Sequence, residues 1–188
     1  MDASQPRIRR GHADDLPFLA EMLVEAAYPP RADPKPTPAE ALADPRAGRY
    51  LRDWGRPGDV ALVAEDDTGQ PLGAAWYRRF PADEPGYGFV APDVPEVAIA
   101  VREGARATRI GSTLLVALID AAAKAGEVAL SLSVSSQNQA ALRLYRRTGF
   151  VERDRPADDA SKLLLFTIQL PATFDDSRDS KSTRGGAP

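Results

Sequence analysis

The fold is decided by residues 96–112, which read Glu-Val-Ala-Ile-Ala-Val-Arg-Glu-Gly-Ala-Arg-Ala-Thr-Arg-Ile-Gly-Ser. This pattern predicts a strand over 96–101, a loop of small and basic residues, and a long helix over 110–124. A helix N-terminus presents unpaired backbone N–H groups and partial positive charge, and small residues let a ligand approach it. Because Arg106 and Arg109 add formal charge, the segment predicts a pyrophosphate site. The alternative is a surface turn with two solvated arginines.

A second segment with regular spacing follows this helix. Residues 138–150 have the form Asn-x-x-Ala-x-x-x-Tyr-x-x-x-Gly-Phe, with Tyr145 at the centre. Residues 128–135 alternate apolar residues with serine, which predicts a strand, and residues 139–147 predict a helix that ends at a glycine. The region therefore has the order strand, loop, helix, strand, helix.

In this order, the two segments resemble the GNAT superfamily of N-acetyltransferases. Residues 106–112 are similar to the family's coenzyme A loop, and residues 138–150 to its second cofactor-contacting segment. The family loop usually reads Arg/Gln-x-x-Gly-x-Gly, and its first glycine is Arg109 in this chain. We expect Arg109 to lie in the first turn of the helix with ordinary right-handed angles, which any L-residue can adopt.

The resemblance implies acetyl-CoA as co-substrate and gives roles to particular residues. The pantetheine arm would pair with the backbone of strand 96–101, which must splay away from strand 128–135. The pyrophosphate would lie on the loop 106–112, and Asn138 would reach the pantetheine arm. The expected cofactor-binding residues are Ile99, Ala100, Val101, Arg106, Ala107, Thr108, Arg109, Ile110, Gly111, Ser112, Asn138 and Ala141.

Glu96 and Tyr145 are the expected catalytic residues. An amine of the lysine kind has a pKa near ~10.4 and must lose a proton before it attacks, so a carboxylate such as Glu96 would serve as the base. By the resemblance, the Tyr145 hydroxyl would protonate the departing thiolate. The alternatives are a solvated acid at a strand edge and a packed tyrosine. His12 is a weaker candidate for the base, because it lies far in sequence from the cofactor motifs.

Acceptor contacts are expected from Tyr28, Trp76 and Tyr77. Tyr28 lies where the family places an acceptor-side loop, whereas aromatic residues in strands are more often part of the core. Three serines, at positions 133, 135 and 136, have no expected base beside them, so direct transfer in a ternary complex is favoured over an acyl-enzyme.

Composition excludes several classes of site and partner. The chain of 188 residues has a net charge of −3, a pI near 5.3, no cysteine and one histidine. A disulfide scaffold, a cysteine nucleophile and the usual zinc site are therefore excluded, and no metal is expected. A mildly acidic chain is also a poor candidate for binding nucleic acid or an anionic membrane. With no signal peptide or apolar span in the sequence, we expect a cytoplasmic protein, with a homodimer as the default assembly.

The whole pattern predicts one mixed α+β domain over residues 1–171. A largely antiparallel mixed sheet would carry helices on both faces, and the polar tail 172–188 is expected to be disordered. The expected strands are 7–9, 60–65, 72–80, 96–101, 128–135, 150–153 and 162–169. The expected helices begin at Asp14 or Asp15 and cover 38–54, with Pro45 as a candidate break, 110–124 and 139–147.

We therefore predict an N-acetyltransferase that moves an acetyl group from acetyl-CoA to a primary amine of a small molecule or peptide. The alternative is a non-catalytic module of the same fold that binds an acyl-CoA and senses or regulates. A remote third possibility is an unrelated nucleotide-binding protein, but the sequence has neither a Gly-Lys-Ser/Thr phosphate loop nor a Gly-x-Gly-x-x-Gly fingerprint.

Overall fold

A computed structural model describes residues 6–28, 34–106, 109–154 and 163–170. These residues form a seven-stranded sheet with the strand order β1-β2-β3-β4-β5-β7-β6. The strands are β1 (Arg7–Arg10), β2 (Val60–Glu65), β3 (Pro71–Arg78), β4 (Glu96–Val101), β5 (Ala129–Ser135), β6 (Val151–Arg153) and β7 (Leu163–Gln169). The helices are α1 (Leu16–Ala27), α2 (Pro38–Ala43), α3 (Ile110–Lys124) and α4 (Gln139–Arg147), with short 3-10 turns η1 (Ala13–Asp15), η2 (Gly48–Tyr50) and η3 (Glu103–Ala105).

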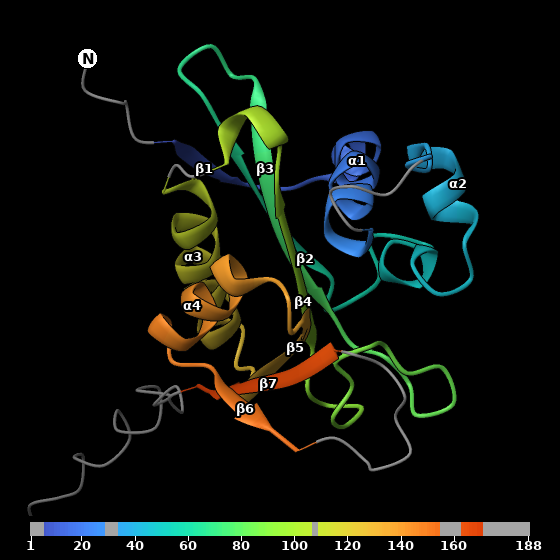
Figure 1. The fold of residues 1–188 in the computed structure, drawn as a ribbon, viewed down its shortest axis with the longest axis vertical. Coiled ribbons are helices and arrows are strands. Elements are labelled where there is room, and N and C mark those ends of the chain that lie inside the picture. The colour runs from blue at the N-terminus through green and yellow to red at the C-terminus, as the bar shows by residue number, and fades with distance from the viewer. Residues whose placement is uncertain (1–5, 29–33, 107–108, 155–162, 171–188) are drawn as a thin grey trace, which may run out of the picture.

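Helices cover both faces of the sheet, as predicted (Figure 1). Each face has its own apolar cluster: α3 and α4 contribute Leu114 and Tyr145 to one, and α1 contributes Leu19 to the other. Because successive side chains of a strand point to opposite faces, Val97 of β4 belongs to the α3 cluster and Ala100 to the α1 cluster. One face of β4 therefore packs against the cluster of α3 and α4, and the other packs against the cluster of α1.

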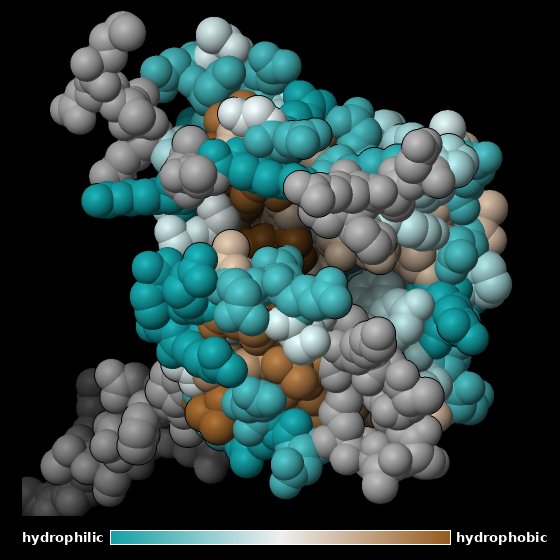
Figure 2. Space-filling model, viewed as in Figure 1, coloured by the Kyte–Doolittle hydropathy of each residue, from teal (hydrophilic) through white to brown (hydrophobic). Residues whose placement is uncertain are grey.

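The sheet opens between its two parallel strands. Among the described strands, neighbours pair antiparallel except β4 and β5, which are parallel and share the single register pair Glu96↔Ser131. On their other sides, β4 pairs with β3 from Glu96 to Val101, and β5 pairs with β7 from Ala129 to Ser135. The predicted splay is thus confirmed. In the same view as Figure 1, the surface is hollowed above α4, and apolar side chains form the floor of the hollow (Figure 2).

The helical stretch expected over 38–54 breaks next to Pro45, the candidate break in the sequence. α2 ends at Ala43, and the Asp44 carboxylate accepts the backbone N–H groups of Arg46 and Ala47, both at 2.7 Å. Side-chain acceptors of this kind favour a turn over a continued helix. The chain therefore turns before η2 instead of running on as one helix.

Arg78 fixes the segment around η2 to the sheet. Its buried guanidinium forms an ion pair with Asp59 at 2.6 Å and donates to the carbonyl oxygens of Arg49 at 2.7 Å and Arg52 at 2.9 Å. Since Arg78 is the register partner of Glu96 on β3, this anchor lies beside the start of β4.

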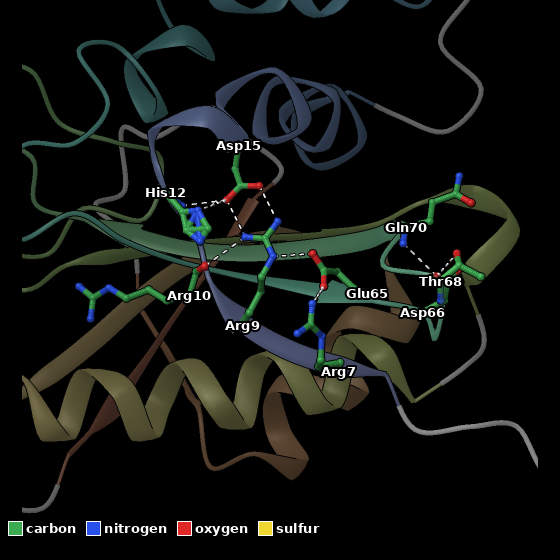
Figure 3. Close-up of polar contacts among 9 residues, drawn as sticks. All are labelled: Arg7, Arg9, Arg10, His12, Asp15, Glu65, Asp66, Thr68 and Gln70. Carbon is green, nitrogen blue, oxygen red and sulfur yellow. Dashed lines mark hydrogen bonds and ion pairs between the residues drawn. The ribbon is translucent and has the colours of Figure 1, made fainter.

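The edge strand β1 is held by ion pairs. Arg9 binds Asp15 at 2.7 Å and Glu65 at 2.5 Å, and Arg7 binds Glu65 at 2.5 Å (Figure 3). These contacts join β1 to the end of β2 and to the residue before α1.

Some predictions concern residues outside the described part of the chain. These are the cofactor-loop residues Ala107 and Thr108, the domain boundary at 171, and the tail 172–188. Within the described part, no helix combines the length and the apolar character that a membrane crossing requires.

Candidate active site

Glu96 lies at the point where β4 and β5 part. It is the first residue of β4, and its carboxylate is buried on the α1 side of the sheet, with 2% of the residue exposed. The Tyr50 hydroxyl donates to Glu96 Oε1 at 2.5 Å, and the Gly88 N–H donates to the same oxygen at 2.7 Å. These two hydrogen bonds to one oxygen fix the direction of the carboxylate.

The β3–β4 loop covers this carboxylate. A Cβ on Gly86 would lie 2.1 Å from Glu96 Oε2, and a Cβ on Gly88 would lie 2.6 Å from the carbonyl carbon of Leu132. Any side chain at these two positions would push the loop away. The two glycines therefore allow the loop to close onto Glu96 and β5.

The β4 edge beyond Glu96 faces the gap in the sheet. Ile99, Ala100 and Val101 pair on one side with β3 and have no register partner on β5 within the described strands. Backbone N–H and C=O groups must find partners when they are buried, and an extended ligand can supply them as an added strand does. The cofactor residues predicted on β4 thus lie at an edge that can accept a pantetheine arm.

The start of α3 lies next to this edge. A Cβ on Gly111 would be 3.7 Å from Val101 Cγ2 and 3.8 Å from Leu144 Cδ2, so Gly111 lies where the end of β4, α3 and α4 meet. Arg109 is the N-cap of α3, just before its first turn, with φ −76° and ψ 3°. The prediction of a first-turn residue with ordinary right-handed angles is therefore wrong: Arg109 precedes the first turn, and its ψ lies outside the helical range although its φ is negative. Ser112 is half-buried in the first turn, and its hydroxyl donates to the Arg109 carbonyl at 2.7 Å.

Arg106 is turned toward α1. Its Nε donates to the Val101 carbonyl at 3.3 Å, and its Nη2 forms an ion pair with Glu25. Glu25 also binds Lys35 at 2.6 Å. The guanidinium expected at the pyrophosphate therefore links the end of β4 to α1 in this structure.

Tyr145 is buried in the cluster under α4. Its ring lies 6.0 Å from that of Phe150 and 6.3 Å from that of Phe166, between ring centroids. Burial raises the pKa of the Tyr145 hydroxyl to about 12. The hydroxyl therefore carries its proton at neutral pH, as a general acid must. Glu96 and Tyr145 belong to opposite faces of the sheet.

Asn138 caps α4. Its Oδ1 accepts the backbone N–H of Ala141 at 3.1 Å, which satisfies one of the free donors at the helix start. Its exposed side chain has an amide NH₂ group as its donor. Ala141 is half-buried and packs against the α3 cluster.

A family model, described as the acetyltransferase (GNAT) family, matches residues 20–150. The chain belongs to the GNAT family. The L-methionine sulfoximine/L-methionine sulfone acetyltransferase of Pseudomonas aeruginosa is 33% identical over 143 residues, which are 76% of this chain and 78% of that protein. Ribosomal-protein-alanine N-acetyltransferase from Brucella melitensis is 28% identical in a structure with a TM-score of 0.64, covering 87% of this chain and 99% of that one. A putative acetyltransferase from Salmonella typhimurium, solved with its cofactor acetyl-CoA, is 22% identical with a TM-score of 0.65, and 98% of each chain is covered.

The three acceptor-binding residues predicted for this GNAT chain, Tyr28, Trp76 and Tyr77, do not lie together in the structure. Tyr28 is half-buried at the end of α1, where burial, followed by the charges of Asp44 and Tyr87, raises the pKa of its hydroxyl. Trp76 and Tyr77 are fully buried, and each lies in a different cluster, because neighbouring residues of β3 face opposite sides. They cannot line one pocket together, so we correct this prediction and assign both to the core.

The sequence reasoning missed the residues that surround Glu96 in this GNAT site. Tyr50 precedes Glu96 by 46 positions, and no local pattern connects the two. In the sequence, Gly86 and Gly88 indicate only a loop. The fold is needed to show that this loop packs on the Glu96 carboxylate, where a side chain would not fit.

Proposed function

We propose that this GNAT protein transfers the acetyl group of acetyl-CoA to the primary amine of a small molecule or peptide by direct attack. The observation that carries the proposal is the splay: β4 and β5 share one register pair, and a buried carboxylate lies at that pair. An open strand edge for the pantetheine arm thus begins beside a candidate base.

The proposed chemistry assigns one proton transfer to each catalytic residue. Acetyl-CoA supplies the activated thioester. Glu96 accepts the proton of the amine, directly or through a water molecule, so that the nitrogen lone pair can attack the thioester carbonyl. As the C–S bond breaks, the Tyr145 hydroxyl gives its proton to the sulfur. Direct attack requires no nucleophile from the chain.

The relatives suggest which acceptors to test first. The Pseudomonas relative acts on an amino acid derivative, and the Brucella protein is named for an alanine of a ribosomal protein. Both names point to an amine next to a carboxyl-derived group. We therefore favour the α-amine of an amino acid or of a peptide N-terminus.

An amine panel tests the function. The purified protein is incubated with acetyl-CoA and, separately, L-methionine sulfone, L-methionine sulfoximine, a peptide with N-terminal alanine, and spermidine, and free thiol is measured over time. We expect acceptor-dependent thiol release with at least one α-amine, and acetylated product by mass spectrometry. Tight acetyl-CoA binding without release for any amine would instead support the non-catalytic module.

Two further properties stay predictions. The cytoplasmic location is expected from the sequence, and the homodimer only from dimers being the commonest assembly. The described residues include no candidate membrane span. Fractionation of cells that express the protein and light scattering of the purified chain would decide them.

A further inference from the structure

The Tyr50 hydroxyl connects the proposed base to the loop that covers it. It donates to Glu96 Oε1 at 2.5 Å and accepts the Tyr87 backbone N–H at 2.8 Å. Since Gly88 donates to the same Glu96 oxygen, the loop reaches the carboxylate both directly and through Tyr50. One hydroxyl thus joins η2, β4 and the β3–β4 loop.

The Tyr50 ring is fixed on two sides. Phe80 meets it edge-on with ring centroids 5.0 Å apart, and Tyr87 stacks on it at 6.3 Å with an interplanar angle of 16°. The residue is 6% exposed. Burial, with the neighbouring charge of Glu96, raises the pKa of Tyr50 well above its usual value, so the hydroxyl remains a donor at neutral pH. A rigid ring therefore holds a protonated hydroxyl against the carboxylate.

The anchor beneath Tyr50 comes from the sheet. Arg78, opposite Glu96 on β3, donates to the carbonyl oxygens of Arg49 and Arg52, which flank Tyr50 in sequence. Arg78 of β3 therefore holds the backbone around Tyr50, and β3 also pairs with β4 at Glu96. This arrangement fixes the orientation of the carboxylate relative to the open edge of β4.

We propose that Tyr50 is a positioning residue for acetyl transfer, acting through Glu96. The inference rests on the proposed function, because it takes Glu96 as the base. A base must lie within hydrogen-bond reach of the proton that it removes, and a displacement of about 1 Å can cost roughly 10²-fold in rate. Tyr50 keeps the carboxylate in place, and its effect on the reaction passes through Glu96.

Tyr50→Phe tests the hydroxyl alone, because the ring keeps its contacts with Phe80 and Tyr87. With L-methionine sulfone, or whichever panel amine reacts fastest, we expect kcat to fall by about 10-fold or more, while the KM for acetyl-CoA stays within about two-fold. Arg52→Ala is the matched control. It removes another link between the η2 segment and the same loop, the exposed Arg52–Glu84 ion pair at 2.8 Å, and should leave kcat unchanged.

The double variant separates this inference from the function on which it rests. If Tyr50 acts through Glu96, Tyr50→Phe should cause little further loss in a Glu96→Gln background. Equal losses in both backgrounds, an unchanged kcat in Tyr50→Phe, or the same loss in Arg52→Ala would overturn the positioning role while leaving Glu96 as base. Full activity of Glu96→Gln alone would instead reject the base, and with it both proposals. Circular dichroism and acetyl-CoA binding confirm that each variant is folded.

Discussion

Hydrogen bonding acts on Glu96 and burial acts on Tyr145. Tyr50 and Gly88 donate to one oxygen of the Glu96 carboxylate and fix its direction, whereas burial raises the pKa of the Tyr145 hydroxyl to about 12 and keeps it protonated at neutral pH. A base must be aimed at the proton that it removes, and an acid must begin with its proton. At the scale of single residues, the local surroundings therefore suit the proposed proton transfers.

Tyr145→Phe should lower kcat and leave the fold and the affinity for acetyl-CoA unchanged. The variant removes only the hydroxyl, and the ring keeps its contacts with Phe150 and Phe166. Because the pKa of Tyr145 is raised to about 12, the wild-type rate should show no alkaline decline from this group below about pH 11. Steady-state kinetics over pH 6–10 checks both points. Equal turnover in the variant would leave Tyr145 a packing residue, with water as the proton source.

Arg106 and Arg109 should contribute unequally to acetyl-CoA binding. Loss of a charge-assisted hydrogen bond typically costs ~1.5–3 kcal/mol, which is roughly 10- to 150-fold in affinity. Arg106→Ala should approach this loss if the guanidinium, which binds Glu25 in this structure, donates to the pyrophosphate of bound acetyl-CoA. Arg109→Gly should change affinity by only a few-fold, since Arg109 already has φ −76°. Calorimetric titration compares them, and a larger loss in Arg109→Gly would refute this assignment of the loop.

At the scale of elements, ion pairs attach the edge strand β1 to its neighbours. β1 is an edge strand of the described sheet, and Arg9 ties it to the end of β2 and to the start of α1 through Glu65 and Asp15 (Figure 3). The Arg9 guanidinium is the main cause that lowers the pKa of both carboxyl groups below their ordinary values. This cluster therefore makes the attachment of β1 dependent on pH.

Arg9→Ala should lower the Tm by about 2–8 °C at pH 7, from a net loss of ~1–2 kcal/mol. A carboxyl whose pKa is lowered on folding stabilises the fold above its unfolded pKa, near ~4, and loses this contribution as the pH falls. The Tm difference between wild type and variant should therefore shrink between about pH 5 and pH 3. Arg10→Ala is the control, because Arg10 points away from the cluster in Figure 3. A Tm difference that is constant over this range would contradict the charge-based account.

At the scale of the whole molecule, the sequence predicted what depends on local periodicity. The bounds of α3 and α4, the strand that begins at Glu96 and the splay beside it follow from spacing and from the GNAT resemblance. Contacts between distant segments did not follow. The link between Tyr50 and Glu96, the buried Arg78 and the ion pair of Arg106 with Glu25 each depend on how separate elements pack.

Trp76 and Tyr77 also show that a residue's surroundings depend on how separate elements pack. Aromatic residues in a strand suit an acceptor pocket and a core equally well by residue type. Only the position of β3 between two covered faces decides for the core. Sequence reasoning therefore misassigned these two aromatic residues, while the roles of Glu96 and Tyr145 stay predictions.

The most direct test of the central claim compares Glu96→Gln with wild type in two measurements on the same preparation, namely kcat with the fastest panel amine and the Kd for acetyl-CoA. The amide keeps the size of the side chain and can still accept the hydrogen bonds of Tyr50 and Gly88, but it cannot take a proton from the acceptor. We predict that kcat falls ~10²–10⁴-fold while the Kd changes less than about two-fold. An unchanged kcat over the whole pH range, with the same Kd, would contradict the claim that Glu96 is the base.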